Sequence, residues 1–122
     1  MPRAILDEDD IHPAIRARIA SHQQVIVQEV LSAVRGNAVV VVGMAMNPFP
    51  KKARLALERA GVPFSYLEYG SYLSRWRERN ALKLWTGWPT FPMVFVKGTL
   101  VGGAKDLQAL IESGEFQRML AA

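Results

Sequence analysis

The sequence contains few side chains that could carry out covalent or metal chemistry. It has no cysteine and two histidines, His12 and His22, among its 122 residues. The lack of cysteine excludes disulfides, a thiol nucleophile and cysteine-ligated zinc or iron–sulfur centres within this chain. No Asp or Glu is spaced around the histidines as in a metal site, which normally has three or four ligands. We therefore expect no metal centre, and we expect both histidines to face solvent or to cap a helix.

The stretch Met46 to Ala53, MNPFPKKA, lies where a predicted strand passes through a tight turn into a predicted helix. Such turns often carry chemistry, but this one holds an asparagine, two prolines and no nucleophile. Asn47 suits a helix N-cap and Pro48 suits the next position. In a second interpretation the Asn47 amide hydrogen-bonds a bound thiol or carbonyl. Pro50 disfavours helical angles at Phe49, so the helix could also begin at Pro50.

The hydrophobic pattern predicts an α/β domain that places this turn at the end of its first strand. In chain order it predicts a short helix from about Pro13, a helix ending at residues 36–37, a buried strand at 38–42, a helix at 48–60, a strand at 62–69, a helix at 71–85 with Ser71 as cap, two short strands at 93–96 and 99–103, and C-terminal helices. The first strand–helix–strand unit should be parallel and right-handed, and the last two strands should form a hairpin. Helices should cover both faces of this small mixed sheet.

Composition sets the broad class of the protein. The length suits one domain, and half of the residues are hydrophobic, which is enough for a core. The first residues lack the pattern of a secretory signal, and the longest apolar run, at 38–46, is too short to span a membrane. We expect a cytoplasmic protein without a membrane partner. The net charge of +4 comes from Lys and Arg spread along the chain, so we do not expect nucleic-acid binding.

The element order, together with the segment WPTFPMVFVKGTLVGG, resembles the glutaredoxin branch of the thioredoxin fold over about residues 38–120. Thr90-Phe91-Pro92 is similar to the turn whose proline is cis in that family, and Gly102-Gly103 to the glycine pair after its last strand. Residues 61–64 are similar to its helix-to-strand link. WPTFP and ESGE also resemble the single-cysteine glutaredoxins. The resemblance implies a three-layer thioredoxin-like fold with a four-stranded mixed sheet and extra N-terminal helices, with 1–22 as an extension and 23–122 as the glutaredoxin-like domain.

The resemblance also gives the opening turn a meaning. Glutaredoxins carry Cys-Pro-Tyr-Cys or Cys-Gly-Phe-Ser at this place. Asn47 and Pro50 occupy the two cysteine positions here, while Pro48 and Phe49 match the family pattern. Thiol–disulfide exchange needs a thiolate, so we do not expect this activity, and we expect no catalytic residue. An amide is likewise a poor substitute for the thiolate that holds an iron–sulfur cluster in single-cysteine members.

The resemblance further implies a groove for glutathione, which is the one candidate ligand or cofactor. Mapped residue by residue, this groove comprises Asn47, Phe49, Lys83, Thr90, Phe91, Pro92, Gly102, Gly103, Ala104, Lys105 and Asp106. Two positions depart from the family. Met44 replaces a common lysine, and Lys105 replaces a common aspartate and would repel the ammonium of the ligand. Pro92 and the glycine pair could also serve the fold alone.

Three functions follow from these observations. The first is a redox-inactive binding or regulatory module whose ligand is glutathione, another small peptide-like molecule or a protein. The second is a transferase-like enzyme that uses the thiol of bound glutathione, stabilised by Asn47, Thr90 or Tyr72. The third is a protein-interaction module that uses the N-terminal helices or the basic helix around Trp76. Arg75, Arg79 and Lys83 share a stripe on that helix, which could equally be a solvated face opposite the anchors Tyr72, Trp76 and Leu84.

Overall fold

The computed structural model describes residues 2–122, so Met1, the first residue of the predicted extension, lies outside the described residues. The elements in chain order are η1 (Glu8–Asp10), α1 (Pro13–Ser21), α2 (Gln24–Gly36), β1 (Val39–Gly43), α3 (Pro48–Arg59), β2 (Ser65–Glu68), α4 (Trp76–Thr86), β3 (Met93–Val96), β4 (Thr99–Gly102), α5 (Ala104–Ser113) and α6 (Glu115–Ala121). From β1 onward this is the predicted order of strands and helices.

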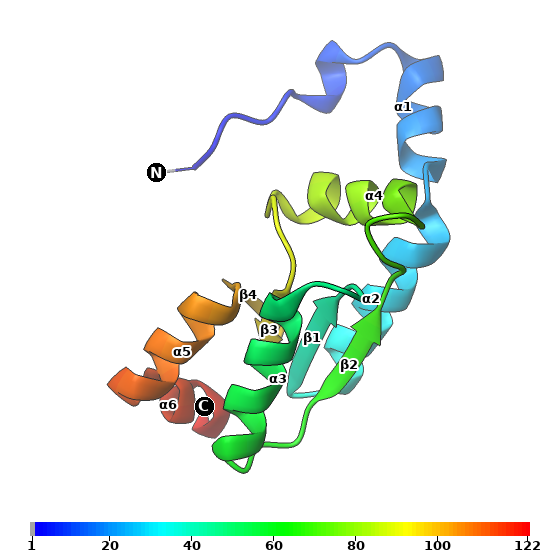
Figure 1. The fold of residues 1–122 in the computed structure, drawn as a ribbon. Coiled ribbons are helices and arrows are strands. Elements are labelled where there is room, and N and C mark those ends of the chain that lie inside the picture. Colours follow the sequence, from blue (N-terminus) through cyan, green and yellow to red (C-terminus); the bar gives the residue numbers. More distant parts are fainter. Residues whose placement is uncertain (1) are drawn as a thin grey trace.

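The strands form one mixed sheet in the order β2-β1-β3-β4 (Figure 1). β1 pairs with β2 in parallel, with Val40 opposite Ser65, and pairs antiparallel with β3, where Val40 lies opposite Phe95. β3 and β4 form the predicted antiparallel hairpin. The parallel pair follows from the helical crossover through α3, whereas the short link between β3 and β4 leaves room only for a tight turn. The observed sheet is that of a thioredoxin-like α/β fold, as expected.

Both faces of β1 are buried, because helices cover the sheet on both sides. Side chains alternate along a strand, so Val40 and Val42 pack with residues of α2 and α4, including Val30 and Leu82. Val39 and Val41 pack on the other face with residues of α3, α5 and α6; this second cluster includes Leu57, Leu107 and Phe116. The three-layer arrangement therefore explains why the strand at 38–42 is apolar without alternation.

The N-terminal segment lies apart from this core. The predicted helix from Pro13 is confirmed as α1, and the His12 imidazole Nδ1 caps it by accepting a hydrogen bond from the Ala14 N–H at 3.1 Å. α1 contributes no buried residue. Arg3 ties the start of the chain to the end of α4, where its Nη1 donates to the Thr86 carbonyl at 3.2 Å. Within residues 2–122 no helix is long and apolar enough to cross a membrane.

The prediction for α4 is wrong in two respects. The helix begins at Trp76 rather than at Ser71, because Ser71 and Ser74 hold a turn in which the Ser71 N–H donates to Ser74 Oγ, and Arg75 then adopts left-handed angles. Arg79, expected on a solvated stripe with Arg75 and Lys83, is only 7% exposed. Its guanidinium Nη1 donates to the carbonyl oxygens of Tyr69 at 2.9 Å and Ser74 at 2.5 Å, which explains its burial.

The predicted apolar anchors of the same helix are also not buried. Tyr72, Trp76 and Leu84 are 61%, 56% and 77% exposed, respectively. Ala81 and Leu82 bury the inner face of α4 instead, beside Arg79. Arg79 and Trp76 therefore depart from the simple expectation that arginine faces water and tryptophan faces the core, whereas Arg77 is exposed as expected.

Candidate functional site

The candidate site begins at the N-terminus of α3, directly after β1. Asn47 is the N-cap, with extended angles, and its Oδ1 accepts a hydrogen bond from the Phe49 N–H at 3.0 Å. Pro48 occupies the first helical position, so the N-cap prediction is confirmed and a helix start at Pro50 is wrong. Pro50 is buried against the end of β1, where a Cβ on Gly43 would lie 2.7 Å from the Pro50 Cβ. Glycine at position 43 therefore permits the close approach of α3 to the sheet.

The Asn47 side chain also reaches the loop before β3. Its Nδ2 donates to the carbonyl oxygen of Phe91 at 3.4 Å, across 44 residues of sequence. Both ends of the amide group are thus engaged within the protein, one with the helix terminus and one with the loop. At the position that the family resemblance assigns to the nucleophile, the structure holds a group that joins two elements. A role for Asn47 toward a bound thiol or carbonyl stays a prediction.

The loop before β3 carries three of the predicted groove residues. The Phe91–Pro92 peptide bond is cis, and both residues are buried, while Thr90 is exposed. Lys83 of α4 lies over this loop, with its Nζ 5.9 Å from the centre of the Phe91 ring. The geometry places the side chains of Asn47, Phe91 and Lys83 around one loop, although they come from three different parts of the chain.

Gly102, Gly103 and Asp106 form the next part of the site. Gly102 has a φ of +111°, and a Cβ there would lie 2.5 Å from Asp106 Oδ2, so this position requires glycine. The Gly103 N–H donates to Asp106 Oδ2 at 2.9 Å, which caps the start of α5. The resemblance predicts Asp106 as a ligand contact, and in the structure one of its carboxylate oxygens already accepts the hydrogen bond of this cap. Gly103 faces the Pro92 carbonyl oxygen, which lies 3.7 Å from an ideal Cβ.

Phe49, Ala104 and Lys105 meet in a groove between α3 and α5 with a volume of about 390 Å³. The other residues that line this groove are not among the predicted site residues. They are Lys52, Leu55, Ala56, Arg59 and Gln108. Those on α3 follow a spacing of three, four and seven residues, which places them on one side of the helix. This periodicity was visible in the sequence, but the facing residues of α5 were not.

A buried tyrosine lies near the same end of the sheet. The Tyr69 N–H donates to the Gly43 carbonyl oxygen at 2.9 Å, and the Tyr69 hydroxyl donates to the carboxylate of Glu29 on α2. Burial raises the pKa of the Tyr69 phenol well above its ordinary value of 10, and the hydrogen bond to Glu29 raises it further. The Arg75 guanidinium, 5.2 Å from the centre of the ring, opposes this shift. Tyr69 therefore stays protonated and acts as a hydrogen-bond donor.

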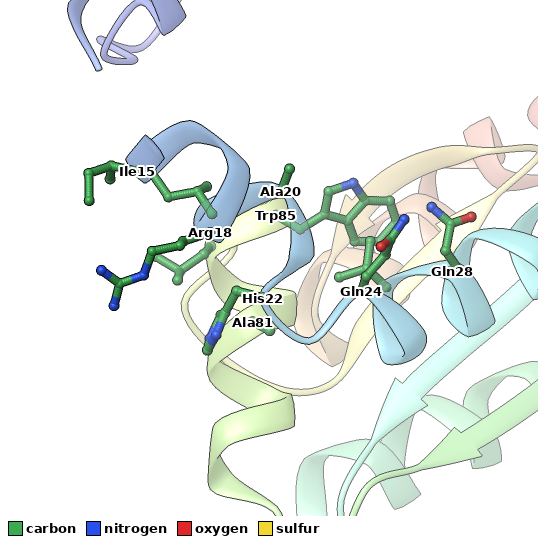
Figure 2. A pocket seen from close by; sticks show the side chains of 11 residues that line it. Ile15, Arg18, Ala20, His22, Gln24, Gln28, Ala81 and Trp85 are labelled. Atoms are coloured by element: carbon green, nitrogen blue, oxygen red, sulfur yellow. The ribbon is translucent and has the colours of Figure 1, made fainter. Parts of the chain in front are cut away.

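A second hollow, of about 660 Å³, lies away from the predicted site residues. Figure 2 shows it between α1, the start of α2 and α4, with Ile15 and Arg18 on one side and Trp85 on another. Its lining is mainly apolar and includes Ile19, Val27 and Leu84. His22, considered above only as a solvent-facing or capping residue, also lines this hollow. The N-terminal helix thus forms one wall of a surface hollow instead of packing on the core.

Candidate metal ligands do not cluster in the described residues. In the part of the chain that the structure describes, no three side chains of His, Cys, Asp or Glu gather as a metal site would require. The sequence has no thiolate that could hold an iron–sulfur cluster, and Asn47 is committed to hydrogen bonds at the position in question.

Comparison with known proteins agrees with this architecture. The family model "Glutaredoxin" matches residues 39–101. A glutaredoxin-like protein of Dictyostelium discoideum is 49% identical over 88 residues, which are 72% of this chain and 72% of the relative. An uncharacterized monothiol glutaredoxin of Synechocystis is 31% identical over 90% of this chain and 94% of its own.

The fold is also that of a solved glutaredoxin. The crystal structure of a buckwheat glutaredoxin–glutathione complex superimposes with a TM-score of 0.71 at 21% identity, covering 82% of this chain and 91% of that one. This likeness supports the fold alone, whereas the family model and the two relatives establish the family. The chain belongs to the glutaredoxin family.

Proposed function

We propose that this chain is a binding or regulatory member of the glutaredoxin family that does not catalyse thiol–disulfide exchange. The observation that carries the proposal is Asn47. The family resemblance assigns this residue to the position of the attacking cysteine, and its amide is engaged by the Phe49 N–H and the Phe91 carbonyl. The sequence has no cysteine elsewhere that could supply the missing thiol. Exchange requires a thiolate, so the remaining scaffold can bind but not attack.

Reduction of a mixed disulfide of glutathione and 2-mercaptoethanol tests this proposal. We expect background rates for the native chain, and a measurable rate for Asn47→Cys, since a cysteine there would sit at a helix N-terminus that lowers thiol pKa. Asn47→Ser is the matched control, because it keeps a capping side chain without a sulfur. Turnover by the native chain at rates typical of an active glutaredoxin would overturn the proposal.

We further propose that the groove around Phe91 and Gly103 binds glutathione weakly. The relative from buckwheat was solved as a glutathione complex. In this chain the loop at Thr90 to Pro92, the Gly103 backbone and Lys83 lie near one another, which supports a peptide-like ligand. The exposed Lys105 opposes the ammonium end of glutathione.

An NMR titration of backbone amides with reduced glutathione tests the groove. We expect saturable shifts at Phe91, Gly103 and Ala104, with a Kd in the millimolar range. Lys105→Asp should tighten binding by roughly fivefold, since it replaces a repulsive contact by an attractive one at the surface. Glu112→Lys, on the same helix, is a control that should leave the Kd unchanged. Absence of saturable shifts in both the native chain and Lys105→Asp would rule out the groove.

The transferase-like alternative is not favoured by the geometry. It needs Asn47, Thr90 or Tyr72 to stabilise the thiolate of bound glutathione. The donor group of Asn47 is already directed to the Phe91 carbonyl, and Tyr72 lies in the exposed turn before α4. We therefore do not propose conjugation as the function.

A protein-interaction surface on α4 is the second candidate, because its aromatic side chain is displayed and not packed. Trp76 is more than half exposed and the Arg77 guanidinium lies 5.2 Å from its ring. Arginine and tryptophan together are typical of binding surfaces. Charge reversal is informative at Arg75 and Arg77 but not at the buried Arg79. An unchanged set of bound proteins for Arg75→Glu with Arg77→Glu would contradict this candidate.

A further inference from the structure

The groove between α3 and α5 combines exposed apolar side chains with a basic rim. On α3 it is lined by Phe49, Lys52, Leu55, Ala56 and Arg59, and on α5 by Ala104, Lys105 and Gln108. Figure 1 shows the two helices next to each other on the same face of the sheet. The groove therefore lies between two elements that the core already holds in place.

Two of its apolar side chains, Phe49 and Leu55, do not belong to the core cluster under the sheet. Ala53 and Leu57 of α3 and Leu107 of α5 are fully buried and form the contact with the core. Phe49 and Leu55, in contrast, are 45% and 37% exposed. Ala56 and Ala104 also line the groove, and their small side chains leave room in it. Exposed apolar surface that is arranged around a hollow and rimmed by charge is typical of a binding surface.

The charges around the hollow have one sign. Lys52, Arg59 and Lys105 line it, and no carboxylate does. The Lys52 ammonium lies 5.0 Å from the centre of the Phe49 ring, above the apolar part of the groove. An occupant must therefore carry negative charge to match the rim and apolar groups to match the floor.

None of the acidic residues on α3 and α5 lines the groove. Glu58 is exposed on α3 and is not part of the lining. Asp106 accepts the hydrogen bond from the Gly103 N–H, and Glu112, one turn beyond the lining, accepts from Gln108 Nε2 at 3.1 Å. The charge complementarity of the groove is thus toward an anion.

We propose that this groove docks an acidic peptide segment of a partner protein that presents aliphatic side chains between its carboxylates. Lys52 and Arg59 are seven residues apart on α3, which corresponds to about 10 Å along a helix axis. Two glutamates seven residues apart on a helical segment, with leucines between them, have the same spacing. This is the helix-in-groove mode of recognition, with a salt-bridged rim. The inference goes beyond the proposed function, because it needs neither a thiol nor bound glutathione.

Fluorescence anisotropy with a labelled peptide tests the docking. The probe contains Glu-Ala-Ala-Leu-Leu-Ala-Ala-Glu, and its matched control has Gln in place of both Glu. We expect saturable binding of the probe, and roughly tenfold weaker binding of the Gln control from the loss of two rim contacts. Equal affinity of the two peptides would overturn the proposal. So would a probe that does not saturate by about 1 mM protein, because a dissociation constant in that range means only weak binding.

Matched variants locate the site on the helix. Lys52→Glu should weaken binding of the probe by about fivefold or more, whereas Lys51→Glu, the same charge change at an exposed neighbour outside the lining, should change it by less than about twofold. Leu55→Ser should weaken both peptides, because it removes the apolar floor without touching charge. An equal effect of Lys51→Glu and Lys52→Glu would contradict docking in this groove.

Amide shifts separate this inference from the glutathione groove. Peptide binding should shift Leu55, Arg59 and Gln108, whereas glutathione should shift Phe91 and Gly103. Peptide shifts without glutathione shifts would refute the glutathione groove and support the docking, and the reverse pattern would do the opposite. Binding of a single-stranded oligonucleotide with the same dependence on Lys52, without peptide binding, would assign the groove to nucleic acid and overturn the peptide proposal.

Discussion

Helices α3 and α4 both lie beside the candidate site, but they differ in which kinds of side chain they bury and expose. α3 begins at a side-chain cap, buries Pro50, Ala53 and Leu57, and exposes Lys51, Lys52 and Arg59 to solvent. α4 has no side-chain cap, buries Arg79, and leaves Trp76 and Leu84 exposed. α3 therefore follows the usual rule for amphipathic helices, and α4 departs from it.

The difference lies in what each helix has to satisfy. α3 follows β1 closely, and the Asn47 side chain accepts a hydrogen bond from the Phe49 N–H at its first turn. α4 follows a turn whose carbonyl groups, at Tyr69 and Ser74, point inward and would lack partners without the Arg79 guanidinium. The buried Arg79 guanidinium donates to these backbone carbonyls and so holds the turn. The turn then sets which side of α4 faces water. The exposed Trp76 is a consequence that a partner protein could exploit.

Replacement of Arg79 should have the largest effect on stability. Arg79→Met removes both hydrogen bonds and leaves two inward carbonyls without a donor, which should lower the free energy of unfolding by about 2–4 kcal/mol. Arg77→Met, on the exposed side of the same helix, should cost no more than about 0.5 kcal/mol. Urea unfolding measures both. Equal losses would mean that the burial of Arg79 contributes nothing specific to α4.

The Tyr69 phenol links the same region to alkaline pH. Its pKa is raised by burial and then by Glu29, and the pKa of Tyr66 is raised to about 12 by burial and then by its hydrogen bond to Glu68. Unfolded phenols ionise near pH 10, so the unfolded state binds fewer protons above that value. The free energy of unfolding should therefore be constant in this respect below about pH 9 and fall as pH rises from about 10 to 12.

Tyr69→Phe should reduce the decrease in the free energy of unfolding at alkaline pH, because one of the two phenols with a raised pKa is removed. At neutral pH it should cost about 1 kcal/mol, because the Glu29 carboxylate loses its donor. Denaturant unfolding at about pH 9 and pH 11.5, chosen to bracket the ordinary phenol pKa, should then show a smaller decrease for Tyr69→Phe than for the native chain. Tyr66→Phe provides the comparison for the phenol on β2. A slope identical to that of the native chain would argue against a buried, hydrogen-bonded Tyr69.

The cap of α3 should matter less than the buried arginine of α4. Asn47→Ala removes the acceptor for the Phe49 N–H and should cost about 1 kcal/mol. Asn47→Asp keeps the cap acceptor but loses the donor to Phe91, so it should retain most of the stability while freeing the loop before β3. Thermal unfolding and the amide shift of Phe91 distinguish the two effects. If Asn47→Asp were as unstable as Asn47→Ala, the contact with Phe91 would outweigh the cap.

The smallest effect is expected at the exposed face of α4. Trp76→Gln should change the free energy of unfolding by no more than about 0.5 kcal/mol, because the ring is more than half exposed and does not belong to the core. Loss of a bound protein without loss of stability would support an interaction surface on this helix. A destabilisation above about 1 kcal/mol would instead show that Trp76 supports the turn before α4.

The candidate site was only partly predictable. Asn47 as cap, the Gly102-Gly103 pair and the turn at Thr90 to Pro92 were found from local patterns and a family resemblance. The hydrogen bond from Asn47 to Phe91 and the position of Lys83 above that ring were not, because they join segments far apart in the chain. The groove between α3 and α5 as a whole escaped prediction for the same reason, since its lining comes from both helices.

The sequence by itself determined the order of helices and strands along the chain, the hairpin and Asn47 as a cap for α3, because hydrophobic period, capping residues and short connections act within a few residues of one another. It also shows that this glutaredoxin-family chain contains no cysteine, which is the basis of the proposal that it does not catalyse thiol–disulfide exchange. Only the tertiary structure decided that Arg79 lies inside and Trp76 outside, and that α3 and α5 enclose a basic groove. These features depend on which distant carbonyls and side chains meet, and no local pattern encodes that meeting.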